Sequence, residues 1–458
     1  MKLHRSRILF ATGMVCALLA GTAPRAAAQG RSVQIPIKEY KLKNGLRVIL
    51  SEDHTSPTYS IAVNYNVGSR DERKGRTGFA HLFEHMMYQG SENVGKGEHF
   101  ILIENNGGGM NGTTNQDRTI YFETLPANQL DLGLYLEADR MKSLVISQAN
   151  LDNQRKAVQE ERRLGIDNQA YGKTFEMILD TAYDNFAYKH STIGSMADLD
   201  AASVEDVAGF FRMYYAPNNA VLALVGDFKS EDALAKIKRY FEGIPAQATP
   251  PVPDLTEPPQ TAERRRTLED TFAQVPRLDI DYKIPVGNTP DWYAMSVLMQ
   301  ILGRGQSSRL YQKLVKEKEA AAATFAGAQE FAGPSLALVI ALVKPGKDLG
   351  ETEKLIAEEI ERVKREPVAD WELEKVRMQV RHDRAQQLTG TLFRSIGLAQ
   401  FAVAYGDPGL INTVEAKYNA VTKEDLQRVA QNYLKDTNRT VITTVPKPAA
   451  AAAGKPGQ

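Results

Sequence analysis

The chain has 458 residues, with 56 Lys and Arg against 56 Asp and Glu, and it contains one cysteine. The charge is balanced and no basic tract stands out, so the sequence argues against nucleic acid as a partner, and a single cysteine excludes an internal disulfide. The length predicts two or three domains.

Residues 1–28 are predicted to be a signal peptide. A basic start is followed by the apolar core Ile8–Leu19, which is too short to span a bilayer, and by the cleavage pattern Ala26-Ala27-Ala28. A membrane anchor is the alternative. Cleavage removes Cys16, no acids and four of the 56 basic residues, which leaves 52 basic residues against 56 acids and a net charge of −4. We therefore expect an exported, periplasmic protein with no membrane span in the mature chain.

The first half of the mature chain mixes strands and helices. Asn44-Gly45 separates two apolar runs within Lys41–Glu52, a pattern typical of a β-hairpin, and Tyr59–Val67 is predicted to be the next strand. Further along, the pattern predicts a helix at His99–Asn106, a strand at Arg118–Leu125, two long helices that end near Val145 and Asp167, and a helix at Thr174–Tyr183.

Between these strands, the stretch from Gly78 to Tyr88 is predicted to be one helix. Its apolar residues recur at i, i+3, i+4 and i+7 and form a buried stripe: Phe79, Leu82, Phe83 and Met86. Thr77 is placed to cap the start of this helix, and Gly90 is placed to end it.

The opposite face of this helix carries His81, Glu84 and His85. Two imidazoles one helical turn apart can bind one Zn²⁺, and a carboxylate beside them can take a proton from an activated water. The alternative is a pair of surface histidines. Only seven histidines occur in the chain, which makes this grouping by chance improbable and favours a metal site.

A hydrolytic zinc site needs a third protein ligand, and the long helix in Ser147–Asp167 offers a carboxylate. We expect its buried face to consist of Leu151, Ala157, Val158 and Leu164, with Gln154 and Glu161 on the same side. A carboxylate within an apolar stripe needs a cation, so Glu161 is the best candidate. The alternatives are Glu160 as the ligand, or a surface salt bridge from Glu161 to Arg155 or Arg162.

These residues resemble the pitrilysin/insulinase family of zinc peptidases. His-Leu-Phe-Glu-His is the inverted zinc motif, and Glu161 follows His85 by 76 residues. Further marks of the family stand in order: Gly108-Gly109-Met110-Asn111-Gly112-Thr113-Thr114, then Asp117, Thr119 and Tyr121, then Gln154-Arg155. The resemblance extends from about Lys38 to Val445. The length is similar to that of the two-domain members, such as mitochondrial processing peptidase subunits.

The resemblance implies roles for individual residues. His81, His85 and Glu161 are the implied ligands of one Zn²⁺ per chain, and Glu84 is the implied general base. Gln154 stands beside the ligands where many members carry a second glutamate. The segment from Asn111 to Tyr121, with Thr114, is implied to hold an extended peptide at a strand edge, although turn chemistry is an equal alternative for Asn111. His99 is predicted to be an ordinary core or surface histidine, and the role of His190 stays open.

Internal repetition favours two homologous domains. Ser203, Asp206, Tyr214 and Asn219 recur 219 residues later as Thr422, Asp425, Tyr433 and Asn438. Each copy predicts a capped helix that precedes a strand, at Ala220–Val225 and at Thr440–Val445. We predict a zinc-bearing domain at 33–246, a proline-rich linker at 247–262, a second domain without the motif at 263–446 and a disordered tail at 447–458.

The second half repeats the mixture of strands and helices. It predicts strands at Arg277–Ile284 and Leu336–Val343, and long helices at Asp348–Arg365 and Trp371–Gln387. Because strands and helices do not alternate strictly, the expected fold class is α+β, with two homologous domains that each pack a largely antiparallel sheet against helices.

The second half also lacks two residues that the family resemblance would supply. In relatives that complete the site from this half, an Arg and a Tyr follow the run that matches Ser307-Ser308-Arg309-Leu310, and Val315 and Ala322 stand there instead. This predicts a heterodimer with a homologous chain that lacks the zinc motif, with a homodimer as the alternative.

The sequence as a whole predicts an exported zinc endopeptidase that acts on peptides or unfolded segments. Two alternatives remain open: a catalytically silent subunit that binds or assembles polypeptides, and a zinc hydrolase of a non-peptide substrate.

Overall fold

The computed structural model describes residues 34–447, so the predicted signal peptide and nearly all of the predicted tail lie outside the described part. The described residues from Ile35 onward form a single compact unit that holds two sheets. Among these residues, no helix combines the length and the apolar character needed to cross a membrane.

The first sheet has six strands in the order β1-β2-β6-β3-β5-β4. Their bounds are Lys38–Lys41 (β1), Arg47–Glu52 (β2), Thr58–Tyr65 (β3), Gly109–Thr114 (β4), Thr119–Pro126 (β5) and Ala220–Gly226 (β6). All neighbours pair antiparallel except β2 and β6, which pair parallel. Strand β4 is therefore an edge strand, and its outer side is available to a further strand.

The second sheet has five strands in the order β7-β11-β8-β10-β9. Their bounds are Arg264–Asp270 (β7), Arg277–Ile284 (β8), Ala321–Gln329 (β9), Ser335–Val343 (β10) and Arg439–Pro446 (β11). Only β7 and β11 pair parallel. Two largely antiparallel sheets packed with helices confirm the predicted α+β class.

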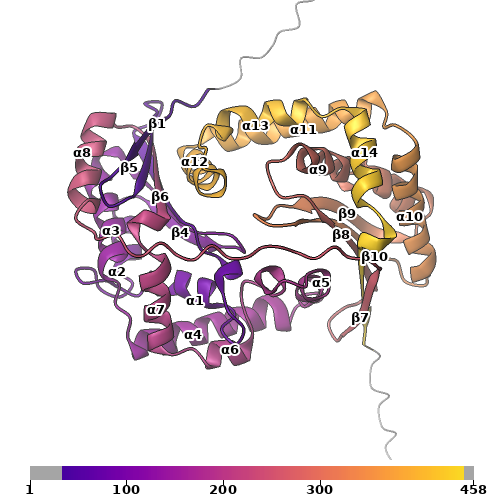
Figure 1. Cartoon of the computed structure of the whole chain (residues 1–458), viewed down its shortest axis with the longest axis horizontal. Helices are drawn as coiled ribbons and strands as arrows, with labels where there is room; N and C mark the ends of the chain where they lie inside the picture. Colours follow the sequence, from indigo (N-terminus) through magenta and orange to yellow (C-terminus); the bar gives the residue numbers. More distant parts are fainter. Residues whose placement is uncertain (1–33, 448–458) are drawn as a thin grey trace, which may run out of the picture. The chain divides into compact units, whose positions relative to one another are not determined.

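Fourteen α-helices accompany the sheets in the described range (Figure 1). In the first half they are Phe79–Met86 (α1), Glu98–Asn105 (α2), Leu130–Ser143 (α3), Gln148–Arg162 (α4), Thr174–Ala182 (α5), Met196–Asp200 (α6), Val204–Tyr214 (α7) and Ser230–Phe241 (α8). In the second half they are Pro290–Gly303 (α9), Leu349–Arg365 (α10), Asp370–Thr389 (α11), Thr391–Tyr405 (α12), Leu410–Asn419 (α13) and Lys423–Tyr433 (α14).

Most strands and helices predicted from the sequence are confirmed to within two residues at their ends. The helix predicted to end near Asp167 is α-helical only to Arg162 and continues as a π-helical segment, Arg163–Asp167, and β1 begins three residues before the predicted hairpin. Strands β7 and β9 were not predicted, and β4 was implied only by the family resemblance, as the strand edge in the segment from Asn111 to Tyr121. The β4 sequence, GMNGTT, has no large apolar residue besides Met110, and β9, AAATFAGAQ, is mostly alanine. Neither segment alternates, so only pairing with a neighbouring strand defines it.

The repeat seen in the sequence has the same local structure in both copies. Ser203 and Thr422 each form a capping box with the aspartate three residues on, at the starts of α7 and α14. After each helix, the side chain of Asn219 or Asn438 donates to the carbonyl oxygen of Tyr214 or Tyr433, at 2.8 Å in both cases. Strands β6 and β11 follow at the same offset.

Each sheet is covered partly by a helix that comes from the other half of the chain. Helix α12 packs on β3 and β6, where Leu398 and Ala399 are fully buried against Ile49 and Ala62. Helix α5 packs on β11 and β7, and the hydroxyls of Thr174 and Thr444 are 2.8 Å apart.

The segment between the sheets has no helix or strand from residue 247 to 261, yet it is anchored. The Glu257 carboxylate accepts from the backbone N–H groups of Asp184 and Asn185, both at 2.9 Å, and pairs with Lys283 at 2.9 Å.

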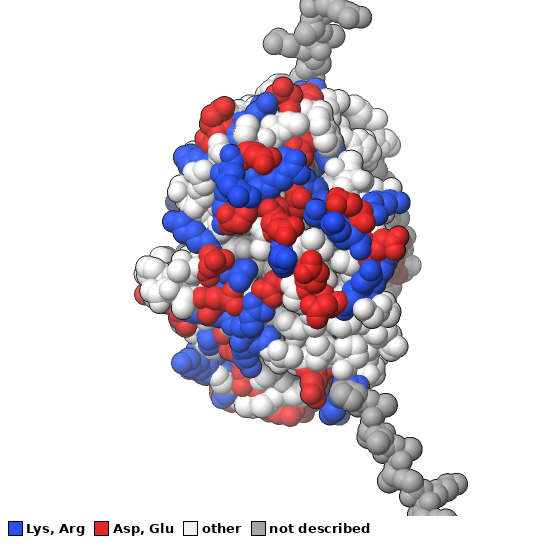
Figure 2. All heavy atoms as spheres, turned by 90° about the vertical axis from the view of Figure 1, so that its right-hand side faces the viewer, with Lys and Arg blue, Asp and Glu red and all other residues white. Residues whose placement is uncertain are grey.

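The face drawn in Figure 2 mixes basic and acidic side chains, in keeping with the near-zero net charge and the absence of a basic tract.

Candidate metal centre

The histidine helix α1 has the predicted apolar face but a different start. Phe79, Leu82, Phe83 and Met86 are all buried. Thr77 does not cap the helix, because its hydroxyl donates to Asp198 instead. The cap residue is Gly78, at φ 85°, where an added Cβ would approach the Ile193 carbonyl oxygen at 2.5 Å. Only glycine suits a left-handed position with so little space.

A buried carboxylate replaces the missing cap. The Glu72 side chain accepts from the backbone N–H groups of Gly78 at 2.9 Å and Ala80 at 2.8 Å, two donors that the helix itself leaves unpaired. Its negative charge also lies at the positive end of the helix dipole. His190 contacts the same carboxylate, with Nε2 2.9 Å from Oε2. This contact gives His190 a structural role, and Glu72 was missed because no local pattern marks a cap contributed from six residues upstream.

The predicted ligand set comes together in the structure. The Nε2 atoms of His81 and His85 lie 3.5 Å and 3.4 Å from one Glu161 carboxylate oxygen, and one ligand atom from each residue falls within 4.8 Å of the others. Ligands at about 2.0–2.1 Å from a tetrahedral Zn²⁺ are separated by about 3.4 Å, so these three residues fit a zinc ion.

Glu161 reaches this position from an open surface rather than from an apolar stripe. Its side chain is 50% exposed, and the predicted burial of Ala157 and Leu164 is wrong, since both are exposed. Glu160 points away and pairs with Arg163 at 3.1 Å. Helical spacing therefore identified the carboxylate that lies beside the two histidines, although the assumed reason, a buried position, was incorrect.

The surroundings keep His81 neutral. Burial and the neighbouring His85 lower the pKa of His81 to about 4, which leaves a lone pair for a metal. Burial is the largest effect on His85 and lowers its pKa, but the hydrogen bond to Glu161 and the charges of Glu161 and Glu84 together outweigh it, so the pKa is raised. The same hydrogen bond lowers the pKa of Glu161. Gln154 is buried beside these ligands, and its amide donates to Asn153.

Glu84 lies beside the histidines and is held by the edge strand. The Thr114 hydroxyl donates to Glu84 Oε2 at 2.6 Å. Gly112 of the same strand lets the two elements approach, because an added Cβ would lie 3.2 Å from Glu84 Cγ. Burial raises the pKa of Glu84, opposed by the Thr114 hydrogen bond. A carboxylate with a raised pKa suits a group that takes up and returns a proton.

The other residues predicted to bind substrate differ in exposure. Asn111 is exposed on β4, where a bound peptide could reach it. Tyr121 is fully buried on β5 opposite Gly112, with its ring against Arg140, so direct contact with substrate does not fit its position. The alternation of β5 points this side chain into the core.

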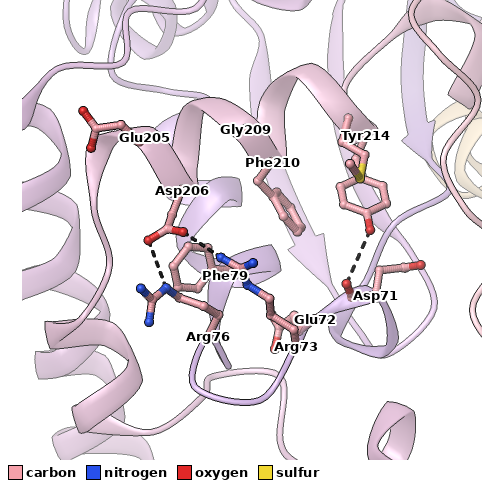
Figure 3. Close-up of a pocket in the computed structure, with 11 residues that line it drawn as sticks. Asp71, Glu72, Arg73, Arg76, Phe79, Glu205, Asp206, Gly209, Phe210 and Tyr214 are labelled. Atoms are coloured by element: carbon pink, nitrogen blue, oxygen red, sulfur yellow. Dashed lines mark hydrogen bonds and ion pairs between the residues drawn. The ribbon is translucent and has the colours of Figure 1, made fainter.

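A cavity of about 410 Å³ lies near the start of α1, against α7 (Figure 3). Arg73 and Arg76 both pair with Asp206 there, at 2.9 Å each, and the Tyr214 hydroxyl donates to the Asp71 carbonyl oxygen. The two arginines of this cavity therefore already have an acidic partner. None of the residues of the candidate metal centre lines the cavity: His81, Glu84, His85 and Glu161.

The fold and the site together define a class: a two-sheet α+β protein with an inverted His-x-x-Glu-His helix and a carboxylate from a second helix, the donor set of a zinc hydrolase. Family models match the same regions. Residues 47–195 match the Insulinase (Peptidase family M16) model, and residues 201–380 match the Peptidase M16 inactive domain model.

Individual relatives agree with this class. Zinc protease PqqE of Helicobacter pylori is 30% identical over 408 residues, which cover 88% of this chain and 92% of that protein. The beta subunit of the mitochondrial-processing peptidase of Lentinula edodes is 22% identical, over 86% and 87% of the two chains. The crystal structure of a protease from Helicobacter pylori superposes with a TM-score of 0.86 at 29% identity, covering 90% of this chain and all of that one. The chain belongs to the insulinase family of peptidases, family M16.

Proposed function

We propose that this chain is a zinc metalloendopeptidase that hydrolyses peptides or unfolded polypeptide segments. The observation that carries the proposal is the convergence of His81, His85 and Glu161 around a space that one Zn²⁺ fits, with Glu84 beside it. The relatives named zinc proteases support the same activity.

The residues of the chain would have separate roles in this reaction. His81, His85 and Glu161 would hold one zinc ion per chain, which would supply Lewis-acid activation of water and of the scissile carbonyl. Glu84 accepts the proton of the attacking water at its carboxylate and delivers it to the leaving amine. Thr114 fixes the rotamer of Glu84 through its 2.6 Å hydrogen bond. The free edge of β4 hydrogen-bonds to an extended peptide and sets its register beside Glu84.

The test pairs metal analysis with a peptide-library digest on the purified mature protein. We expect about one Zn²⁺ per chain and cleavage by the wild type. Glu84→Gln should keep the zinc and the fold but lose turnover, because it removes the base and leaves the ligands. Retained cleavage by zinc-loaded Glu84→Gln would exclude Glu84 as the base.

A catalytically silent polypeptide-binding subunit is the second candidate. The match of residues 201–380 to a domain described as inactive favours it for the second half, and the intact donor set in the first half argues against it. Binding of peptides without cleavage of any library member, in protein with a full complement of zinc, would favour this candidate.

We further propose that the zinc chain works with a homologous partner, as a heterodimer or, alternatively, as a homodimer. Val315 is half-buried and Ala322 is exposed on β9, and neither side chain can donate a hydrogen bond to a substrate carbonyl. A partner without the zinc motif would supply those donors. Activity measured alone and after mixing with a co-exported homologue tests this, and full activity unaffected by any partner contradicts it.

The proposed location is the periplasm, after cleavage near Ala28, and rests on the predicted signal peptide. N-terminal sequencing of the protein recovered from its native compartment tests both the location and the cleavage site.

The proposed domain limits, 33–246 and 263–446, rest on the 219-residue repeat and on the two sheets.

A further inference from the structure

A second cavity, of about 420 Å³, lies among α9, α11, α12 and α13 in the second half. Its volume falls in the range of ligand pockets, roughly 300–1,000 Å³. Its walls are rich in aromatic rings, among them Trp292, Phe393, Tyr405 and Tyr418, and Phe393 is 59% exposed. Aromatic faces attract cations.

Three charged side chains line this cavity, and only one of them is free. Asp383 forms a two-point ion pair with Arg304 at 2.7 and 3.1 Å. Arg384 donates to the Ile411 carbonyl oxygen at 2.6 Å and to Gln387 at 3.1 Å. Glu330, just beyond β9, is open to solvent and makes no hydrogen bond or ion pair within residues 34–447. The cavity therefore presents one carboxyl group without a partner in the described part of the chain.

The wall also holds an unused hydrogen-bond donor. Trp292 is 7% exposed, and its indole nitrogen finds no partner in the described part of the chain. A buried donor without a partner is uncommon, but this nitrogen has almost no accessible surface, so it would reach a ligand acceptor only after a movement of the side chain.

The chain leaves room around the free carboxylate. A Cβ added to Gly287 would lie 2.1 Å from Glu330 Oε1 and 2.3 Å from the Tyr405 hydroxyl, so glycine at this position lets both groups share one small space. Burial and, second, the charge of Asp117 raise the pKa of Glu330 to about 7, so its carboxyl group is about half ionised near neutral pH, and a cation bound beside it would favour the ionised form. Asp117 lies in the turn between β4 and β5 and accepts from the backbone N–H of Ala332 at 3.0 Å, which places the Glu330 segment beside the hairpin that carries Thr114.

We propose that this cavity is a binding subsite for a basic side chain, Lys or Arg, of a polypeptide substrate. Glu330 pairs with the cation, and the aromatic wall covers the aliphatic stem. The proposal deepens the peptidase function proposed above and rests on it for the identity of the ligand as substrate.

Binding is measured apart from cleavage, by fluorescence anisotropy on the full mature chain carrying Glu84→Gln. The probes are fluorescein-labelled, N-acetylated decapeptides of Ala, Leu and Ser with one arginine moved along the sequence, each with a twin that carries neutral citrulline. We expect the arginine probe to bind about ten-fold more tightly than its twin at one or more positions, as the gain of a charge-assisted hydrogen bond predicts.

Further substitutions in the Glu84→Gln protein show which residues cause the difference in affinity between the arginine and citrulline probes. Glu330→Gln should abolish the difference between the twins, and Glu330→Asp should retain part of it. Gly287→Ala, which crowds the carboxylate, should reduce it. Glu424→Gln is the matched control, since Glu424 is exposed on α14 outside the cavity, and it should leave the difference unchanged.

Equal binding of the twins at every position, or an arginine preference that survives Glu330→Gln, overturns the proposal. A dependence on a free α-amine in non-acetylated probes, without a dependence on arginine, also overturns it. The proposed function fails separately: absence of cleavage by the zinc-loaded wild type with an intact Glu330-dependent preference leaves a polypeptide-binding site on a silent protein.

Discussion

At the residue scale, a group of four ionisable side chains is buried beneath the edge hairpin. They are His99 on α2, Glu123 on β5, and Glu137 and Arg140 on α3. Arg140 pairs with Glu137, while Glu123 Oε2 lies 3.4 Å from His99 Nε2. Burial raises the pKa of Glu123 to about 8 and lowers the pKa of His99 to about 3. Near neutral pH, a protonated Glu123 can therefore donate to a neutral His99, which is a core histidine as predicted.

This burial gives the contribution of Glu123 to stability a defined dependence on pH. A glutamate whose folded pKa is raised from about 4.5 to about 8 binds more protons folded than unfolded between these values, so its contribution to stability falls as pH rises, by about 1.4 kcal/mol per pH unit. Below about pH 6.5 the buried, neutral His99 contributes a slope of opposite sign, so the fall is expected between about pH 6.5 and 8. Glu123→Gln should flatten the slope in that range and be the more stable form at pH 8 and above. Urea unfolding from pH 5 to 9 measures it, with exposed Glu424→Gln as control. Parallel curves for wild type and Glu123→Gln would contradict the assignment.

A second prediction separates two adjacent carboxylates. Glu161→Gln should strip zinc from the purified protein, since a neutral amide is a poor ligand, whereas Glu160→Gln should retain it, because Glu160 faces Arg163. Metal analysis after dialysis against a weak chelator measures the zinc content of both variants. If Glu161→Gln retained zinc and Glu160→Gln lost it, the zinc ligand would be Glu160 and not Glu161.

At the element scale, the start of α1 is built by tertiary contacts. Glu72 satisfies two of its free N–H groups, and Gly78 passes under the Ile193 carbonyl oxygen in a left-handed conformation. His81 follows three residues later, so the position of the first imidazole depends on this turn.

Gly78→Ala should therefore weaken both folding and zinc binding. The left-handed strain costs about 1–2 kcal/mol, and the 2.5 Å approach to Ile193 forces a further shift of the helix start. Gly75→Ala is the matched control, with φ 80° and no atom within 4 Å of the added Cβ, and it should carry the strain alone. Urea unfolding and competitive zinc titration measure the two effects. Equal zinc affinity in both variants would show that this turn does not position His81.

At the scale of the whole molecule, the two halves exchange helices. Helix α5 packs on the second sheet and α12 packs on the first, and α12 spans the positions 219 residues after α5. The repeat therefore includes the helix caps of α7 and α14 and also the helices α5 and α12, each of which packs on the sheet of the other half.

This exchange predicts that the halves unfold together. Leu398 on α12 is fully buried against the first sheet, so Leu398→Ala should cost about 2–5 kcal/mol and shift a single unfolding transition. Leu164→Ala, at a side chain that is 59% exposed, should be near neutral. Two transitions, with only one shifted by Leu398→Ala, would mean that the halves fold independently.

The sequence by itself determined the fold class, the confirmed elements, the repeat and the grouping of His81, Glu84 and His85, because helical and strand periods are local properties. It also selected Glu161 by its spacing. Tertiary structure alone decided that Glu72 replaces Thr77 at the start of α1, that Tyr121 is buried and that Glu161 is open to solvent. A period states which residues share a face, but what covers that face depends on segments far away in the chain. For the same reason, the sequence did not reveal Glu330, whose pocket is assembled from four helices only when the chain is folded.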